Sequence, residues 1–243
     1  MSGFDFTGPT GILSQQEIYS IQYHLVLTTY MSEKDAQAEM NKYGLTLDTE
    51  LSQKDPTGQN RVWVNSHPGN GLGDAVVSCR GTQSFRNVVT DVFAVFFGFT
   101  KNIAPDFINV KAITLAAENK YGVVDAVGHS LGGTLASYSR ANGRIVTFNK
   151  GAGIFSLFNR TPDNETDYRT DLDVVSVLSY FENHLKGNII TNTSPNVNSI
   201  AGEILKGHGM KNFETFLPWV EQQKPDSFQR FLLFQQNIHS NLK

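Results

Sequence analysis

The chain has 243 residues, of which 40% are hydrophobic, and it carries a formal net charge of −3 with a sequence pI near 6.1. A chain of this size can bury one large core, so we expect a single domain over residues 1–243. The mild negative charge argues against a nucleic-acid partner, which favours a basic face. Cys79 is the only cysteine, so no intrachain disulfide can form.

Targeting and membrane signals are weak along the whole sequence. The first residues do not combine a basic stretch with a following apolar one, so we expect no cleaved secretory signal and, by default, a cytoplasmic location. The longest strongly apolar run, residues 92–99, is far shorter than the roughly 20 residues that a membrane-spanning helix needs. We therefore expect no transmembrane segment.

Residues 1–44 are expected to form a helical N-terminal segment. Ser14 and Glu17 have the spacing of a capping box, ahead of apolar residues that fall on one helical face. Ser32 and Asp35 repeat this start signal. The sequence predicts two successive helices here, but it does not indicate what they do.

Two short runs with strand character follow, at residues 61–64 and 75–78, and a glycine-rich stretch at 67–74 separates them. Glycine-rich loops can bind phosphate when a helix begins directly after them. A strand follows instead, so the pattern favours a hairpin.

From residue 84 onward the pattern alternates between helices and strands. The expected helices cover residues 84–97, 105–119 and 226–238, and the expected strands cover 123–127, 144–148 and a short segment near Tyr168. Strands that alternate with helices indicate a mostly parallel sheet with helices on both faces. The predicted fold class is therefore α/β.

Residues 128–133 read Gly-His-Ser-Leu-Gly-Gly, directly after a predicted strand and before a helix-compatible segment. This context is typical of a nucleophile elbow, in which the serine lies on a turn so sharp that its hydroxyl stands above the sheet. Small residues two positions before and after the serine relieve the crowding, and Gly128 and Gly132 occupy those positions. The motif predicts Ser130 as a nucleophile in an α/β-hydrolase fold.

A serine nucleophile needs two hydrogen-bond donors for the oxyanion. The backbone N–H of Leu131, at the start of the predicted helix, is one candidate because free amides and the helix dipole favour negative charge there. Thr82, in the turn after the 75–78 strand, is the other candidate. An ordinary strand-end turn explains Thr82 equally well.

The catalytic base should be a histidine that follows the acid in sequence, since this fold orders its triad as Ser, Asp or Glu, His. Three histidines satisfy that order: His184, His208 and His239. His208 is flanked by glycines in a loop, as catalytic histidines often are, so it is favoured. We interpret His129, beside the nucleophile, as structural.

The acid is expected just past the strand near Tyr168. Asp173 precedes an apolar run that could anchor it, and Asp171 is the alternative. The acidic stretch at 163–167 could suggest calcium, but it lacks the glycine and terminal glutamate of an EF-hand loop. It is better interpreted as a solvated turn.

Together these residues resemble the class 3 lipases, whose fungal triacylglycerol lipases are the best-known members. The matching pieces are residues 80–91, 128–133, 173–176 and 208–213. The resemblance implies an α/β-hydrolase fold that needs no metal or organic cofactor, with Ser130 as nucleophile, Asp173 as acid, His208 as base, and Thr82 and Leu131 as oxyanion donors. It also implies a lipid or ester substrate, met at a membrane or lipid-droplet surface.

The chain departs from that family at two places that border its substrate cleft. Residues 105–108 replace the family's His-x-Gly-Phe segment, and residues 149–153 replace its Gly-Ser-Pro type of turn. A phospholipase A or a soluble carboxylesterase would use the same triad, and a non-catalytic lipid-binding or interaction module could keep the fold. The apolar stripe within residues 85–97 could form a lid or simply pack on the sheet.

Overall fold

The computed structural model describes residues 11–56, 58, 60–81, 104–151, 162–170, 188–192 and 210. In this part of the chain a mixed sheet of seven strands forms the centre, and the strands lie side by side in sequence order. The strands are β1 (Leu45–Leu47), β2 (Asn60–Asn65), β3 (Ala75–Cys79), β4 (Val124–His129), β5 (Ile145–Phe148), β6 (Glu165–Thr170) and β7 (Asn188–Asn192). The pairings are antiparallel from β1 to β3 and parallel from β3 to β7.

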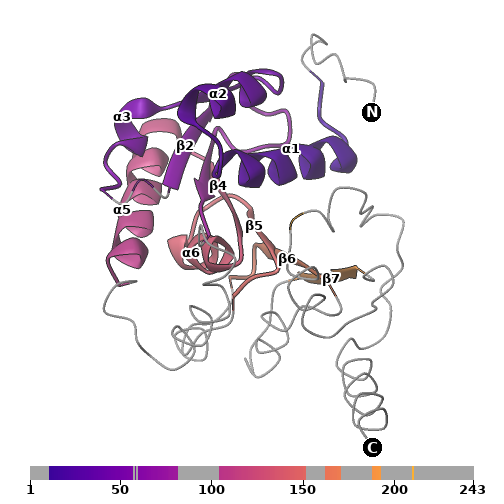
Figure 1. Ribbon diagram of the computed structural model, residues 1–243. Coiled ribbons are helices and arrows are strands. Elements are labelled where there is room, and N and C mark those ends of the chain that lie inside the picture. The colour runs from indigo at the N-terminus through magenta and orange to yellow at the C-terminus, as the bar shows by residue number, and fades with distance from the viewer. Residues whose placement is uncertain are drawn as a thin grey trace, which may run out of the picture.

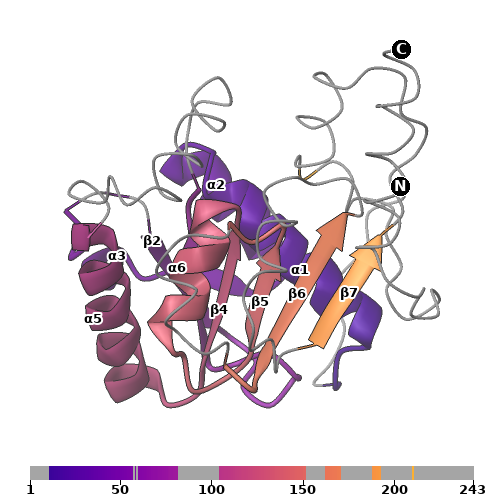
Figure 2. The same ribbon diagram turned by 90° about the horizontal axis from the view of Figure 1, so that it is seen from below.

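Helices cover both faces of this sheet, as Figures 1 and 2 show. Helices α1 (Gln15–Thr28) and α2 (Glu33–Asn41) lie on one face. Helices α5 (Ala104–Tyr121) and α6 (Leu131–Ser139) lie on the other, where the short helix α3 (Thr49–Ser52) contributes to the same core. The sheet and its two helical layers are those of an α/β fold.

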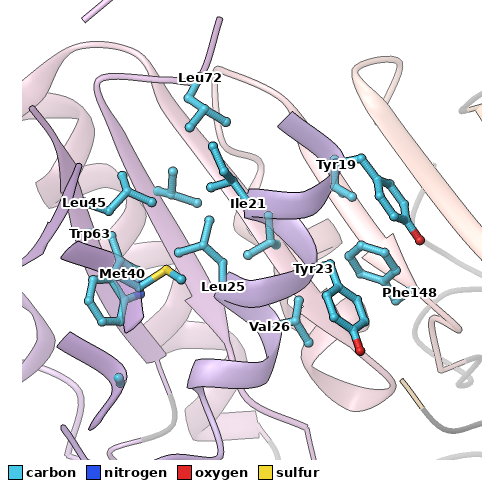
Figure 3. Packing of buried hydrophobic residues seen from close by; sticks show 14 of the residues in the cluster. Tyr19, Ile21, Tyr23, Leu25, Val26, Met40, Leu45, Trp63, Leu72 and Phe148 are labelled. Atoms are coloured by element: carbon cyan, nitrogen blue, oxygen red, sulfur yellow. The ribbon is translucent and has the colours of Figure 1, made fainter. Parts of the chain in front are cut away.

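The sheet divides two hydrophobic cores because strand side chains alternate between its faces. Val76 and Val127 pack toward α1 and α2, whereas Val77 and Ala126 pack toward α5 and α6. Figure 3 shows the first core, in which side chains of α1 meet Trp63 and other strand residues. Strands buried on both faces are what a parallel sheet requires, and every residue of β3 and β4 is buried.

Both predicted helix starts are confirmed. The Ser14 hydroxyl accepts the Glu17 N–H at 3.3 Å, and the Glu17 carboxylate accepts the Ser14 N–H at 2.7 Å, which completes a capping box. The Ser14 hydroxyl also donates to the Glu17 carboxylate at 2.7 Å, and this bond, followed by the one from the Ser14 N–H, lowers the pKa of Glu17. The Ser32 hydroxyl caps α2 by accepting the Asp35 N–H at 3.2 Å.

The hairpin of β2 and β3 and the elements α5, β4, β5 and β6 are also confirmed, with shifts of a few residues at their ends. Three observed elements were not predicted: β1, α3 and β7. They are three to five residues long, too short for a reliable periodic signal. The helices predicted over 84–97 and 226–238 lie outside the described residues.

Candidate active site

Ser130 lies between the last residue of β4 and the first residue of α6, at the C-terminal ends of the parallel strands. Its backbone has φ 57° and ψ −124°, a region that non-glycine residues seldom adopt. Strain of this kind persists only where the surrounding structure imposes it, and it concentrates at functional sites. The residue is 5% exposed. The turn predicted from the sequence is therefore present, and Ser130 is its strained residue.

The two predicted glycines have a steric reason to be glycine. A methyl carbon on Gly128 would lie 2.1 Å from the carbonyl oxygen of Gly132. One on Gly132 would lie 2.3 Å from the carbonyl oxygen of Cys79, at the end of the neighbouring strand β3. Both contacts are with backbone that cannot move aside cheaply. Strand β4, helix α6 and the end of β3 therefore approach one another closely around Ser130.

Backbone hydrogen bonds hold the serine in this conformation. The Ser130 N–H donates to the carbonyl of Phe148, at the end of β5, over 3.1 Å. The Ser130 carbonyl accepts the N–H groups of Thr134, at 3.2 Å, and of Gly151, at 3.0 Å. Three elements thus fix the serine backbone: the end of β5, the first turn of α6 and the loop after β5.

The first turn of α6 provides anion-stabilising groups beside Ser130. The first N–H groups of a helix lack acceptors within the helix, and the dipole adds positive potential at that end. Leu131 is the first residue of α6, and the Ser130 side chain makes no capping hydrogen bond to this helix. The Leu131 amide therefore belongs to the helix end whose potential favours an anion.

The loop after β5 is held by buried polar contacts. Asn149, with φ 44°, accepts the Thr170 N–H on its side-chain oxygen at 2.9 Å and so ties this loop to the end of β6. The Lys150 ammonium lies 2.7 Å from the Glu165 carboxylate, and both side chains are almost fully buried. Ser137 of α6 donates to the same carboxylate at 2.6 Å. This network joins the loop, β6 and α6 behind the elbow.

The end of α1 reaches the same end of the sheet. The Tyr30 hydroxyl accepts the N–H of Gly81, two residues beyond β3, at 3.2 Å. The Arg80 guanidinium lies 5.6 Å from the centre of the Tyr30 ring, within range of a cation–π interaction. Burial raises the pKa of the Tyr30 hydroxyl, so the phenol stays neutral.

Of the five predicted site residues, the structure places Ser130 and Leu131 side by side at the elbow. Thr82, Asp173 and His208 lie outside the described residues, as does the stripe within 85–97. The alternatives Asp171, His184 and His239 lie outside them too. His129 is buried at the end of β4. The structure therefore describes the turn that holds Ser130, and the roles of all five residues stay predictions.

Other chemistries find little support in the described ranges. Cys79 is fully buried, and this burial raises the pKa of its thiol, so it is not an activated nucleophile. No group of three His, Cys, Asp or Glu side chains suited to a metal ion occurs among those residues. No helix among them is both long and apolar enough to span a bilayer.

Two features near the elbow were missed by the sequence reasoning. Tyr30 gave no signal, because its contact with Gly81 joins residues 51 positions apart in the chain. The buried pair of Lys150 and Glu165 was missed as well. The interpretation of residues 163–167 as a solvated turn is wrong, because Glu165 and Asp167 lie in β6 and are buried, whereas charges in a sequence are more often solvated. Only the fold brings these residues together.

No protein-family model matches this chain, and no curated protein matches it. The functional argument therefore depends on the sequence motifs and on the geometry of the elbow.

Proposed function

We propose that this chain is a serine hydrolase that cleaves carboxylic esters of lipids through an acyl-enzyme, with Ser130 as the nucleophile. The observation that carries the proposal is the strained backbone of Ser130 between β4 and α6, enclosed by two glycines that tolerate no side chain. Such a turn presents a hydroxyl above the sheet beside free helix amides. A serine with only a structural role has no need of this conformation.

In the proposed mechanism His208 takes the proton of the Ser130 hydroxyl as its oxygen attacks the ester carbonyl. Asp173 orients the imidazole and stabilises its charged form, and the N–H groups of Leu131 and Thr82 bind the oxyanion. The alcohol leaves with the proton from His208, and water then releases the acid by the same steps in reverse order. Metal and organic cofactors have no part in these steps.

Three described neighbours support the residues assigned by sequence. Gly81 precedes Thr82 directly, and a methyl carbon on it would lie 2.7 Å from the carbonyl oxygen of His129 in the elbow strand. Strand β6 ends at Thr170, three positions before Asp173, and is the second strand after the elbow strand. Met210, two positions after His208, is buried in the core that contains Phe148.

The lipid part of the proposal depends on the resemblance to class 3 lipases. A panel of a short-chain ester, a triacylglycerol and a phospholipid distinguishes a lipase from a carboxylesterase and from a phospholipase A. We expect hydrolysis of the long-chain triacylglycerol to exceed that of the phospholipid.

The catalytic part is tested by hydrolysis of p-nitrophenyl butyrate. Ser130→Ala should lower kcat/KM by about 10⁴-fold or more, since removal of one triad member leaves only the oxyanion site and substrate binding. Ser66→Ala, at an exposed serine, should leave the rate unchanged. Equal activity in the two variants would contradict the proposal.

A further inference from the structure

Helix α1 runs from one end of the sheet, at the loop between β2 and β3, to the other end, where the parallel strands finish. Next to its start, the Leu13 N–H donates to the Asn70 carbonyl at 2.7 Å, in the loop between β2 and β3. Beyond its end, the Tyr30 hydroxyl meets Gly81 at the opposite end of the sheet, where β3 ends beside the elbow. Figure 2 shows α1 lying across one face of the sheet. Helix α1, for which the sequence indicates no role, therefore ends beside the candidate site.

An arginine holds the C-terminal end of α1 in place on both sides of Tyr30. The Arg61 guanidinium, from β2, donates to the carbonyl of Met31 at 2.8 Å and also to that of Thr28. These are carbonyls at the C-terminal end of α1, where a cation is also favoured by the helix dipole. Tyr30 is thus held between two carbonyls that bind the same arginine.

The contact that Tyr30 makes is with the turn that leads into the proposed oxyanion donor. Its hydroxyl oxygen lies 3.2 Å from the Gly81 nitrogen, and a methyl carbon on Gly81 would lie 2.7 Å from that oxygen and 3.6 Å from the Gly132 nitrogen. Gly81 therefore lies close both to the Tyr30 hydroxyl and to the first turn of α6. A residue that holds the Gly81 amide limits how far the next amide can move.

We propose that Tyr30 is a positioning residue for the candidate active site: its hydroxyl holds the Gly81 amide and so fixes the end of β3 against the first turn of α6. This inference depends on the proposed function. Oxyanion stabilisation needs donors in place before the charge develops, and a displacement of about 1 Å can lower the rate about a hundredfold. The effect should fall on the chemical step and leave substrate binding unchanged.

The test compares Tyr30→Phe with Tyr43→Phe in the full chain. Tyr30→Phe removes the hydroxyl and keeps the ring that Arg80 contacts. Tyr43 lies just before β1, at the end of the sheet opposite the elbow. Tyr43→Phe removes a hydroxyl that forms a hydrogen bond with Ser20. Each variant is assayed for kcat and KM with p-nitrophenyl butyrate, for its rate of reaction with a fluorophosphonate, and for its Tm.

We expect Tyr30→Phe to lower kcat and the phosphonylation rate about tenfold to a hundredfold, with KM within about twofold of the native value. Tyr43→Phe should change neither rate. A native kcat in Tyr30→Phe, or a loss confined to Tm and KM, would overturn the role of Tyr30 alone. If the native protein reacts with neither reagent, the proposed function fails, and this inference fails with it.

Discussion

The two ends of helix α6 share an unusual backbone feature and differ in everything around it. Ser130 at the first end and Arg140 at the second are both non-glycine residues with positive φ, 57° and 58°. Arg140 is exposed and adopts the left-handed conformation that commonly ends a helix. Ser130 is buried and enclosed by glycines whose replacement would strike backbone. Positive φ alone therefore does not indicate a site; at Ser130 it coincides with tightly packed backbone.

The largest expected change in stability comes from breaking the buried ion pair of Lys150 and Glu165, which lies beside the first end of α6. Lys150→Met leaves the Glu165 carboxylate buried without its cation, which should lower the free energy of unfolding by about 3–5 kcal/mol. Lys42→Met removes a partner of Glu39 that is 63% exposed, and it should cost less than about 1 kcal/mol. Chemical denaturation measures both values. An equal loss of unfolding free energy in the two variants would mean that the ion pair of Lys150 and Glu165 does not stabilise the fold as a buried pair.

The next effect tests the tight packing of the elbow itself. Gly128→Ala places a methyl carbon against the Gly132 carbonyl, which should cost about 3 kcal/mol, at the upper end for overpacking, and disrupt the turn. The control is Gly69→Ala, where φ is 83° and no atom lies within 4 Å of the added methyl. It should cost only about 1 kcal/mol, from backbone conformation. Denaturation of the two variants compares steric crowding at Gly128 with backbone strain at Gly69.

A smaller effect separates the strain at Ser130 from its chemistry. Ser130→Gly and Ser130→Ala both remove the hydroxyl, but only glycine relieves the backbone at φ 57° and ψ −124°. We expect Ser130→Gly to be more stable than Ser130→Ala by about 1 kcal/mol, while both are inactive. Arg140→Gly, at the other end of α6, should gain about 0.5–1 kcal/mol and keep native activity. Loss of activity in Arg140→Gly would remove the contrast between the two ends.

Local signals explain what the sequence predicted correctly. The caps at Ser14 and Ser32, the hairpin and the elbow each depend on residues a few positions apart, so a short window contains the whole pattern. The parallel pairing of the strands around the elbow followed from the alternation of helices and strands. The serine and its two glycines could thus be identified before the fold was known.

Contacts between distant segments explain what the sequence did not predict. The carbonyls of Thr28 and Met31 bind Arg61, and the Tyr30 hydroxyl binds Gly81, although these partners lie 30 or more positions apart. Nothing in a window around Tyr30 distinguishes it from the other tyrosines of the N-terminal segment. The site's supporting residues emerge only when the sheet brings the end of α1 beside the end of β3.

The central claim is that the strained serine at the start of α6 is the nucleophile. The direct measurement is mass spectrometry of the peptides formed after the native, folded protein reacts with a fluorophosphonate, which bonds to an activated serine with loss of fluoride. The account predicts one phosphonyl adduct, on Ser130, that is absent from protein denatured before the reaction. An adduct on another residue, or an unmodified Ser130 in native protein, would contradict it.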